Sequence, residues 1–138
     1  MKKYYVDTNV WRDYYEDRKD NFKPLGEFAF RFFKKCRKDN SVILYSDLTL
    51  RELNAYYSKE RVEILLQAVS VFCEIKKVFI NAEQGKEANS LVKRFKVHSA
   101  DLLHAILARD NNAVLVSRDK HFNKLKDIVK IAKPEEII

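Results

Sequence analysis

The sequence predicts an α/β fold with a largely parallel central sheet. Short β-type runs alternate with amphipathic helical patterns along the 138 residues, and this alternation is typical of layered α/β proteins. No internal repeat, low-complexity tract or linker interrupts it, and the chain contains only two Gly and two Pro residues. Hydrophobic residues make up 46% of the chain, which is sufficient for a packed core. We therefore expect residues 1–138 to form a single domain.

Each element is predicted from the spacing of its apolar residues and from the signals at its ends. Ser46 and Ser99 are candidate N-caps of two helices. The polar and aromatic residues 11–24 leave the structure of that segment open. In chain order the predicted elements are a strand at Lys3–Val6, a helix at Leu25–Lys38, a strand at Val42–Tyr45, a helix from Ser46 through Tyr56, a helix at Glu60–Cys73, a strand at Lys77–Ile80, a helix at Ala82–Phe95, a helix at Ser99–Arg109, a strand at Ala113–Val116, a short helix at Lys120–Lys126 and a strand at Val129–Ala132.

The composition favours an anionic partner. Lys and Arg number 27 against 20 Asp and Glu, for a formal charge of +7, and nucleic acid is the commonest partner of such basic chains. No apolar run approaches the roughly 20 residues that cross a bilayer, and residues 1–7 lack the apolar core of a signal peptide. Cys36 and Cys73 form no CxxC pair, so we expect neither a disulfide framework nor a zinc site, and a cytoplasmic location.

Three acidic residues follow predicted strands. Asp7 comes directly after the first strand, Glu52 lies in the first turns of the helix after the second, and Asp119 follows the strand that ends at Val116. Functional residues of open parallel sheets gather beyond the carboxyl ends of the strands, so these acids are candidate site residues. Taken singly, Asp7 could instead be a helix cap or turn residue, Asp119 a solvated loop acid and Glu52 an exposed helix acid.

A fourth acid, Asp101, stands in a helix that is otherwise apolar nearly all round. The segment 100–108 reads Ala-Asp-Leu-Leu-His-Ala-Ile-Leu-Ala, and such a helix is typically buried. Its polar side chains, Asp101 and His104, are spaced i and i+3 and share a face. A buried carboxylate requires a partner or a metal, although Asp101 could also cap the helix. His104 could orient Asp101, bind a phosphate, or be a satisfied core histidine.

Four gathered carboxylates indicate a hard divalent cation. Like charges in proximity raise one another's pKa values and repel, and Mg²⁺ or Mn²⁺ offsets this through its preference for oxygen ligands. The chain has no Gly-rich phosphate loop, Walker motif or nucleophile elbow. Phosphodiester hydrolysis by metal-activated water is therefore the reaction class that fits.

The residues around these acids resemble the PIN domain family, and within it the VapC-type toxins. The matching pieces run in the family's order and are 7–9 (Asp-Thr-Asn), Ser46 with Glu52 and Leu53, 99–105 (Ser-Ala-Asp-Leu-Leu-His-Ala), and 114–122 (Val-Leu-Val-Ser-Arg-Asp-Lys-His-Phe). The resemblance implies a three-layer α/β/α fold, an acidic site that holds Mg²⁺ or Mn²⁺, and endonucleolytic cleavage of RNA. By position it makes Asp7, Glu52, Asp101 and Asp119 the acidic quartet, and Thr8, Asn9 and Ser117 polar residues that support it. It also implies a possible small antitoxin partner. The polar segment Trp11–Asp20 departs from the apolar residues common in the family at that point.

Basic and aromatic residues suggest how partners could bind. Arg118, Lys120 and Lys124 flank Asp119 and are candidate contacts for RNA phosphates. A second basic stripe could also follow an RNA backbone or could simply be a solvated helix face; it consists of Arg31, Lys34, Lys35 and Lys38. Several aromatic residues could stack on bases, pack in the core or form a protein interface; they are Tyr4, Tyr5, Trp11, Tyr14 and Tyr15. For Tyr14 and Tyr15 we expect a homodimer or antitoxin contact.

The sequence leaves three functions open. The first is a metal-dependent endoribonuclease, which could be the toxin of a type II toxin–antitoxin pair. The second is a catalytically idle PIN-like module that binds RNA or protein, against which the intact acidic quartet argues. The third is a metal-dependent phosphatase of another α/β fold, which requires an Asp-x-Asp arrangement after the first strand, where this chain has Asn9.

Overall fold

A computed structural model describes residues 1–138 and contains a five-stranded sheet in which every pair of neighbours is parallel. The strand order is β3-β2-β1-β4-β5, so β1 lies at the centre. The strands are β1 (Lys3–Val6), β2 (Val42–Tyr45), β3 (Glu74–Lys77), β4 (Val114–Val116) and β5 (Ile131–Ala132). The predicted α/β fold with a largely parallel sheet is confirmed.

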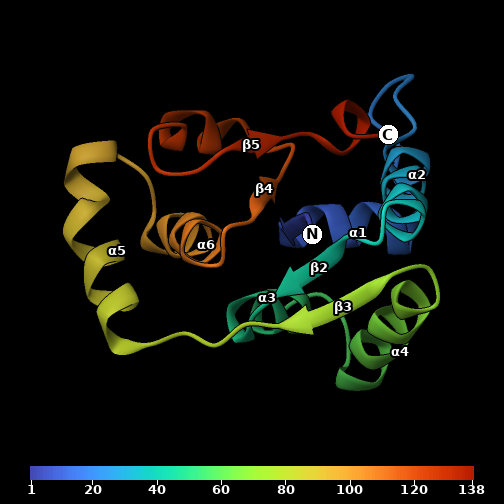
Figure 1. Cartoon of the computed structure of the whole chain (residues 1–138), viewed down its shortest axis with the longest axis horizontal. Helices are drawn as coiled ribbons and strands as arrows, with labels where there is room; N and C mark the ends of the chain where they lie inside the picture. The colour runs from blue at the N-terminus through green and yellow to red at the C-terminus, as the bar shows by residue number, and fades with distance from the viewer.

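Helices cover both faces of this sheet, as Figure 1 shows. The strands contribute residues to both cores. The helices α1, α2, α3 and α4 contribute to one core, and α5, α6 and η1 contribute to the other. The helices are α1 (Thr8–Glu16), α2 (Leu25–Lys38), α3 (Asp47–Asn54), α4 (Lys59–Ser70), α5 (Ala82–Phe95) and α6 (Ser99–Asp110), with two short 3₁₀ helices, η1 (Lys120–Leu125) and η2 (Pro134–Glu136). No helix combines the length and the apolar character that spanning a membrane requires.

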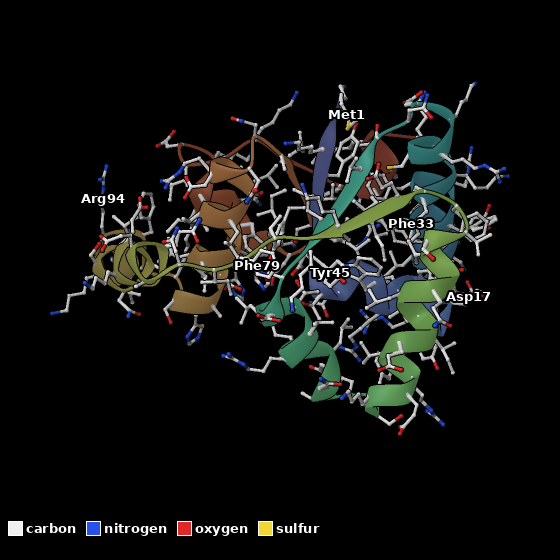
Figure 2. All side chains as sticks on the ribbon, turned by 60° about the horizontal axis from the view of Figure 1, so that its bottom comes forward. Met1, Asp17, Phe33, Tyr45, Phe79 and Arg94 are labelled. Carbon is white, nitrogen blue, oxygen red and sulfur yellow. The ribbon has the colours of Figure 1, made fainter.

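The two cores follow from the alternation of side chains along β1. Tyr4 and Val6 pack in the core beneath α1 and α2, whereas Tyr5 packs in the core beneath α6, because successive strand residues point to opposite faces. Phe33, labelled in Figure 2, lies on the buried face of α2 and is completely buried. Its ring centroid lies 5.7 Å from that of Trp11. Since Tyr4, Tyr5 and Trp11 are all buried, the possibility that these three stack on bases is wrong.

Several predicted boundaries agree with the structure, and others need correction. β1, β2, α2 and α5 begin and end at the predicted residues. The third strand is Glu74–Lys77 rather than Lys77–Ile80, because pairing of Glu74 with Val42 sets its register. The preceding helix consequently ends at Ser70 instead of Cys73, which leaves three residues to turn into the strand.

Two local predictions at element ends are also wrong. Ser99 is the first residue of α6, and the N-cap position is taken by His98 without a side-chain hydrogen bond. The last strand is Ile131–Ala132 rather than Val129–Ala132, because Val129 is buried in the core beside η1. The cap predicted at Ser46 is confirmed, since its hydroxyl accepts a hydrogen bond from the backbone N–H of Thr49.

The segment left open by the sequence contains α1 and the loop 17–24. Its polar composition obscured the helix, because the buried face of α1 includes the carboxylate of Asp13, which is 2% exposed. This charge is accommodated by Arg18, whose guanidinium lies 2.7 Å away, and by Arg118 at 3.7 Å. Both arginines lie outside α1, so only the tertiary structure supplies the partners that offset the cost of burying the Asp13 carboxylate.

Candidate metal centre

The four candidate acids are carried by elements that meet at the carboxyl edge of the sheet. Asp7 follows β1 and Asp119 follows β4, while Glu52 lies in α3, which directly follows β2. The backbone N–H of Asp7 donates to the carbonyl of Val116 at 2.9 Å, so the ends of β1 and β4 are joined where the two aspartates emerge. Asp101 comes from the first turn of α6.

Ser117 connects two of the acids. Its hydroxyl donates to Oδ2 of Asp7 at 3.0 Å and accepts from the backbone N–H of Asp119 at 3.0 Å. Because Ser117 is buried and its hydroxyl makes both bonds, it sets the relative position of Asp7 and Asp119. Asp119 itself caps η1, because its Oδ1 accepts from the backbone N–H of His121 at 2.9 Å.

Thr8 and His104 hold Glu52. The Thr8 hydroxyl donates to Oε1 of Glu52 at 2.6 Å, and Nε2 of His104 lies 2.7 Å from the same oxygen. Burial alone would raise the pKa of Glu52, but the hydrogen bonds from His104 and Thr8 outweigh burial, so that the pKa is lowered. Glu52 is therefore held as a carboxylate.

His104 is in turn fixed by Tyr5, at the centre of a buried polar network. The Tyr5 hydroxyl lies 2.8 Å from Nδ1 of His104, 2.7 Å from the Ser46 hydroxyl and 3.4 Å from that of Thr49. A neutral imidazole satisfies these contacts if Nε2–H donates to Glu52 and Nδ1 accepts from Tyr5. His104 is 1% exposed and fully hydrogen-bonded, so it is a satisfied buried histidine that contacts Glu52 rather than Asp101.

Burial and neighbouring acids raise the pKa values of two of the aspartates, Asp7 and Asp101. Burial, reinforced by the charges of Glu52 and Asp119, raises the pKa of Asp7 to about 6. Burial also raises the pKa of Asp101, and repulsion by Asp119 and Glu52 adds to the effect. Without a cation, the folded chain therefore works against the ionisation of both aspartates.

Each of the four acids keeps at least one oxygen free of hydrogen bonds. All the bonds to Asp7, Glu52 and Asp119 use a single oxygen of each carboxylate, and Asp101 accepts none. Glu52, Asp101 and Asp119 are partly exposed, whereas Asp7 is only 5% exposed, so three of the four carboxylates are accessible to solvent. In Asp7, Glu52 and Asp119, neighbouring residues thus hold one carboxylate oxygen by hydrogen bonds, and the second oxygen of each has no hydrogen bond.

This donor set fits a hard divalent cation by its chemistry. No three Asp, Glu, His or Cys side chains converge on a point that would hold an ion without rearrangement. Mg²⁺ nevertheless requires only one or two carboxylates, because it keeps several waters and takes phosphate oxygens from its substrate. Solvent-accessible carboxylate oxygens that repel one another are suited to such a site.

The remaining predicted residues differ in their surroundings. Asn9 is exposed and bonds to Arg12 at 3.4 Å, and it contacts none of the acids. Arg118 donates to both oxygens of Glu135 at 2.7 and 2.8 Å, which fastens the end of β4 to η2. Lys120 and Lys124 are exposed and form no ion pair. Lys124 donates a hydrogen bond to the carbonyl of Lys96 at 3.5 Å. Of the three basic residues expected at RNA phosphates, two therefore lack an acidic partner and one is neutralised.

Tyr5 and Thr49 were not predicted as parts of this site, and Ser46 was predicted only as a helix cap and as a matching residue of the family resemblance. A signal for Tyr5 existed, since a lone histidine in a buried helix needs a polar partner. A tyrosine two residues before Asp7 in the central strand points to the same face of the sheet as Asp7. Which strand residue would meet His104 depended on how α6 packs on the sheet.

Comparison with known proteins identifies the fold. The PIN domain family profile matches residues 4–128. The chain is similar to one in the crystal structure of VapBC2 from Rickettsia felis bound to a DNA fragment from their promoter, with a TM-score of 0.70 and 18% identity over 95% of this chain and 98% of that one. It is also similar to one in the crystal structure of FitAcB from Neisseria gonorrhoeae, with a TM-score of 0.58 and 16% identity over 95% and 97%. No curated protein matches the sequence. At these identities the two structures show the fold alone, and they confirm the expected three-layer architecture.

The Tyr5 network yields a stability prediction. Tyr5→Phe removes one hydroxyl and leaves His104 Nδ1 without a partner, so we expect the free energy of unfolding to fall by about 1–3 kcal/mol. Tyr14→Phe is the matched control, because the Tyr14 ring packs on Phe33 at 5.4 Å and its hydroxyl makes no hydrogen bond in the structure. Urea unfolding compares the two variants, and equal stabilities would contradict the network.

The raised pKa of Asp7 yields a prediction of pH dependence. The folded state favours the protonated form of Asp7, so the contribution of Asp7 to stability is greatest below its unfolded pKa of 3.8 and is lost as the pH rises to about 6. Asp7→Asn cannot ionise, and in EDTA its stability relative to wild type should increase across this window by at most about 3 kcal/mol. Urea unfolding between acidic and neutral pH measures the difference, and a difference that does not change with pH would show that Asp7 ionises freely.

Proposed function

The chain belongs to the PIN domain family, and from this premise we propose that it is a metal-dependent endoribonuclease. In this proposal it hydrolyses RNA phosphodiester bonds, with Mg²⁺ or Mn²⁺ held by Asp7, Glu52, Asp101 and Asp119. The observation that carries the proposal is the geometry of the acids at the carboxyl edge of the sheet. Ser117 joins Asp7 to Asp119, and Thr8, the residue after Asp7, bonds to Glu52. When bound, the metal supplies an activated water and stabilises charge that develops on the phosphate.

The surrounding residues prepare the acids for this chemistry. Thr8 and His104 keep Glu52 ionised and hold its Oε1, so that Oε2 remains available. Ser117 orients Asp7 through Oδ2 in the same way. These contacts reduce the freedom of the ligand side chains before any cation binds, which raises affinity for the cation.

RNA is the substrate that the charge of the chain favours. The formal charge is +7, and exposed Lys120 and Lys124 on η1, next to Asp119, are candidate phosphate contacts. The family match contradicts the alternative of a phosphatase with a different α/β fold. An idle PIN-like binding module remains the competing function, and it predicts RNA binding without cleavage.

We also propose a protein partner, either a small antitoxin or a second copy of the chain. The VapBC2 structure is of a complex. In this chain, Tyr15 packs edge-on against Tyr57 at 4.9 Å, and Arg12 lies 3.5 Å from the ring of Tyr56, which is 59% exposed. Aromatic rings and arginine are enriched at interfaces. The proposed contact is therefore supported by this surface cluster, which lies on α1 and on the turn after α3 and consists of Arg12, Tyr15, Tyr56 and Tyr57.

Cleavage and metal binding can be tested together. We expect the purified chain to cut single-stranded or looped RNA with Mg²⁺ or Mn²⁺ and not in EDTA. Asp101→Asn and Asp119→Asn should abolish cleavage while the stability of the metal-free protein stays equal or rises, because each removes a repelling charge. Mn²⁺ should raise the melting temperature of the wild type, by about 2.7 kcal/mol of stabilisation at a hundredfold excess over Kd, and the variants should show a smaller rise.

Asp127→Asn is the matched control, because Asp127 is exposed and forms no ion pair; it should cut RNA and respond to Mn²⁺ as the wild type does. Equal cleavage in EDTA would refute the metal mechanism. Binding of RNA with no cleavage under any metal condition would identify the idle module instead.

The partner proposal predicts association in solution. Light scattering of the purified chain should detect a dimer, or a small protein should co-purify with it. Tyr56→Ser should weaken that association without unfolding the chain, since Tyr56 is exposed. A monomer at high concentration, with no co-purifying protein, would argue strongly against both partners.

A further inference from the structure

Two cavities with basic walls adjoin the acidic site. The first, here called the Asp119 cavity, measures about 580 Å³ and is lined by Asp119 together with Lys23, Lys120, Lys126 and Lys133. The second, the Asp101 cavity, measures about 370 Å³ and is lined by Asp101 together with Lys96, His98, His121 and Lys124. Both volumes lie within or near the range of small-molecule sites.

The 3₁₀ helix η1 separates the two cavities. Residues three apart in a 3₁₀ helix lie above one another, so Lys120 and Asn123 share the face towards the Asp119 cavity, while His121 and Lys124 share the face towards the Asp101 cavity. Phe122 and Leu125 occupy the third face, which is buried in the core. Asp119 caps the start of η1, so one acid of the site stands where the two cavities approach each other.

The lysines of both cavities lack acidic partners. Among all the ion pairs of the structure, lysine contributes only through Lys35, Lys77 and Lys86, none of which lines either cavity. Arg118 also lines the Asp119 cavity, but Glu135 neutralises it. The Asp119 cavity also contains the carboxylates of Asp20 and Glu136, which form no ion pair with its lysines, so lysines outnumber acids in its wall. Six ammonium groups therefore line the two cavities without forming an ion pair; they are Lys23, Lys96, Lys120, Lys124, Lys126 and Lys133.

This distribution of charge matches a specific requirement of the substrate. Four carboxylates repel a polyanion, so a strand can approach them only if positive charge nearby outweighs the repulsion. A nuclease site that binds only the end of an RNA strand needs such positive charge on one side of its acids alone. Here the unpaired lysines occur on both sides of η1, and each group lies beside a different acid.

We propose that the two cavities bind the backbone phosphates on either side of the scissile bond of one RNA strand. The RNA strand crosses the start of η1. The phosphates on one side of the scissile bond lie in the Asp119 cavity, and those on the other side lie in the Asp101 cavity. This inference rests on the proposed ribonuclease function and adds to it the path of the substrate. A path open at both ends admits internal segments of RNA, which accounts for endonucleolytic rather than terminal cleavage.

The basic stripe on α2 lies away from this path. Leu25, at the start of α2, lines the Asp119 cavity, and α2 then runs towards the opposite edge of the sheet, since β2 begins at Val42, four residues after the helix ends. Lys34 and Lys38, in the second half of α2, are exposed and unpaired, as are the cavity lysines. They therefore serve as a control with the same change in charge at a different place.

Binding of a short fluorescein-labelled single-stranded RNA, followed by anisotropy in EDTA at several salt concentrations, tests the proposal without cleavage. Lys126→Gln with Lys133→Gln alters one cavity, and Lys96→Gln with Lys124→Gln alters the other. We expect each pair to weaken binding severalfold and to reduce the slope of log K against log salt by about 0.7 for each phosphate that the variant no longer neutralises. Lys34→Gln with Lys38→Gln should leave both quantities unchanged, and circular dichroism should show that all three proteins are folded.

The outcomes separate this proposal from the proposed function. If the wild type binds RNA through both cavities yet cuts nothing with metal, the nuclease function fails while the path stands. If the wild type cuts RNA but either cavity pair binds as the wild type does, the continuous path is overturned. An equal loss in the α2 pair would show that binding follows total charge, and would also overturn the assignment.

Discussion

The mutual repulsion of four carboxylates at one edge of a parallel sheet is the constraint on which the rest of this structure depends. Asp7 is buried and Asp101 is half-buried, and both have raised pKa values because they lose hydration and lie near other acids. Such a group is stable only if neighbouring donors hold the charges in place. The chain provides these donors from three elements: Thr8 at the start of α1, His104 in α6 and Ser117 after β4.

The donors are effective because they belong to the two cores. His104 is held by Tyr5, whose hydroxyl is buried in the sheet and meets Ser46 at the start of α3. The network therefore joins β1, α3 and α6, the elements that carry or precede three of the four acids. The orientation of the acids thus depends on the packing of the helices on the sheet, because a shift of α6 against β1 would disrupt the packing and the hydrogen bonds of His104 together.

Positive charge is divided between structural and accessible roles. Arg18, Arg109 and Arg118 pair with Asp13, Glu87 and Glu135 and hold parts of the fold together. Lysines near the acids remain exposed and unpaired. This division agrees with the geometry of the two side chains, because the planar guanidinium suits fixed bidentate pairs whereas the ammonium group is a flexible, well-hydrated point charge.

The sequence by itself determined the fold class and most of the elements, and it predicted the four acids as a site. Strand and helix periods depend on local burial, so β1, β2, α2 and α5 were predicted to the residue, and parallel topology placed Asp7, Glu52 and Asp119 at one edge. Elements whose pattern depended on distant partners were not predictable. α1 has the buried charge of Asp13, which Arg18 and Arg118 compensate, and the bounds of β3 follow from its register with β2.

Only the tertiary structure decided which atoms meet within the site. Sequence spacing placed His104 on the same face of α6 as Asp101, yet the packing of α6 against β1 and α3 turned its ring to Tyr5 and Glu52. Arg118 looked like a phosphate contact from its position beside Asp119, but the C-terminal η2 brings Glu135 to it. Periodicity assigns a residue to a face, whereas the partner of a polar side chain depends on which elements approach that face, and long-range packing sets that approach.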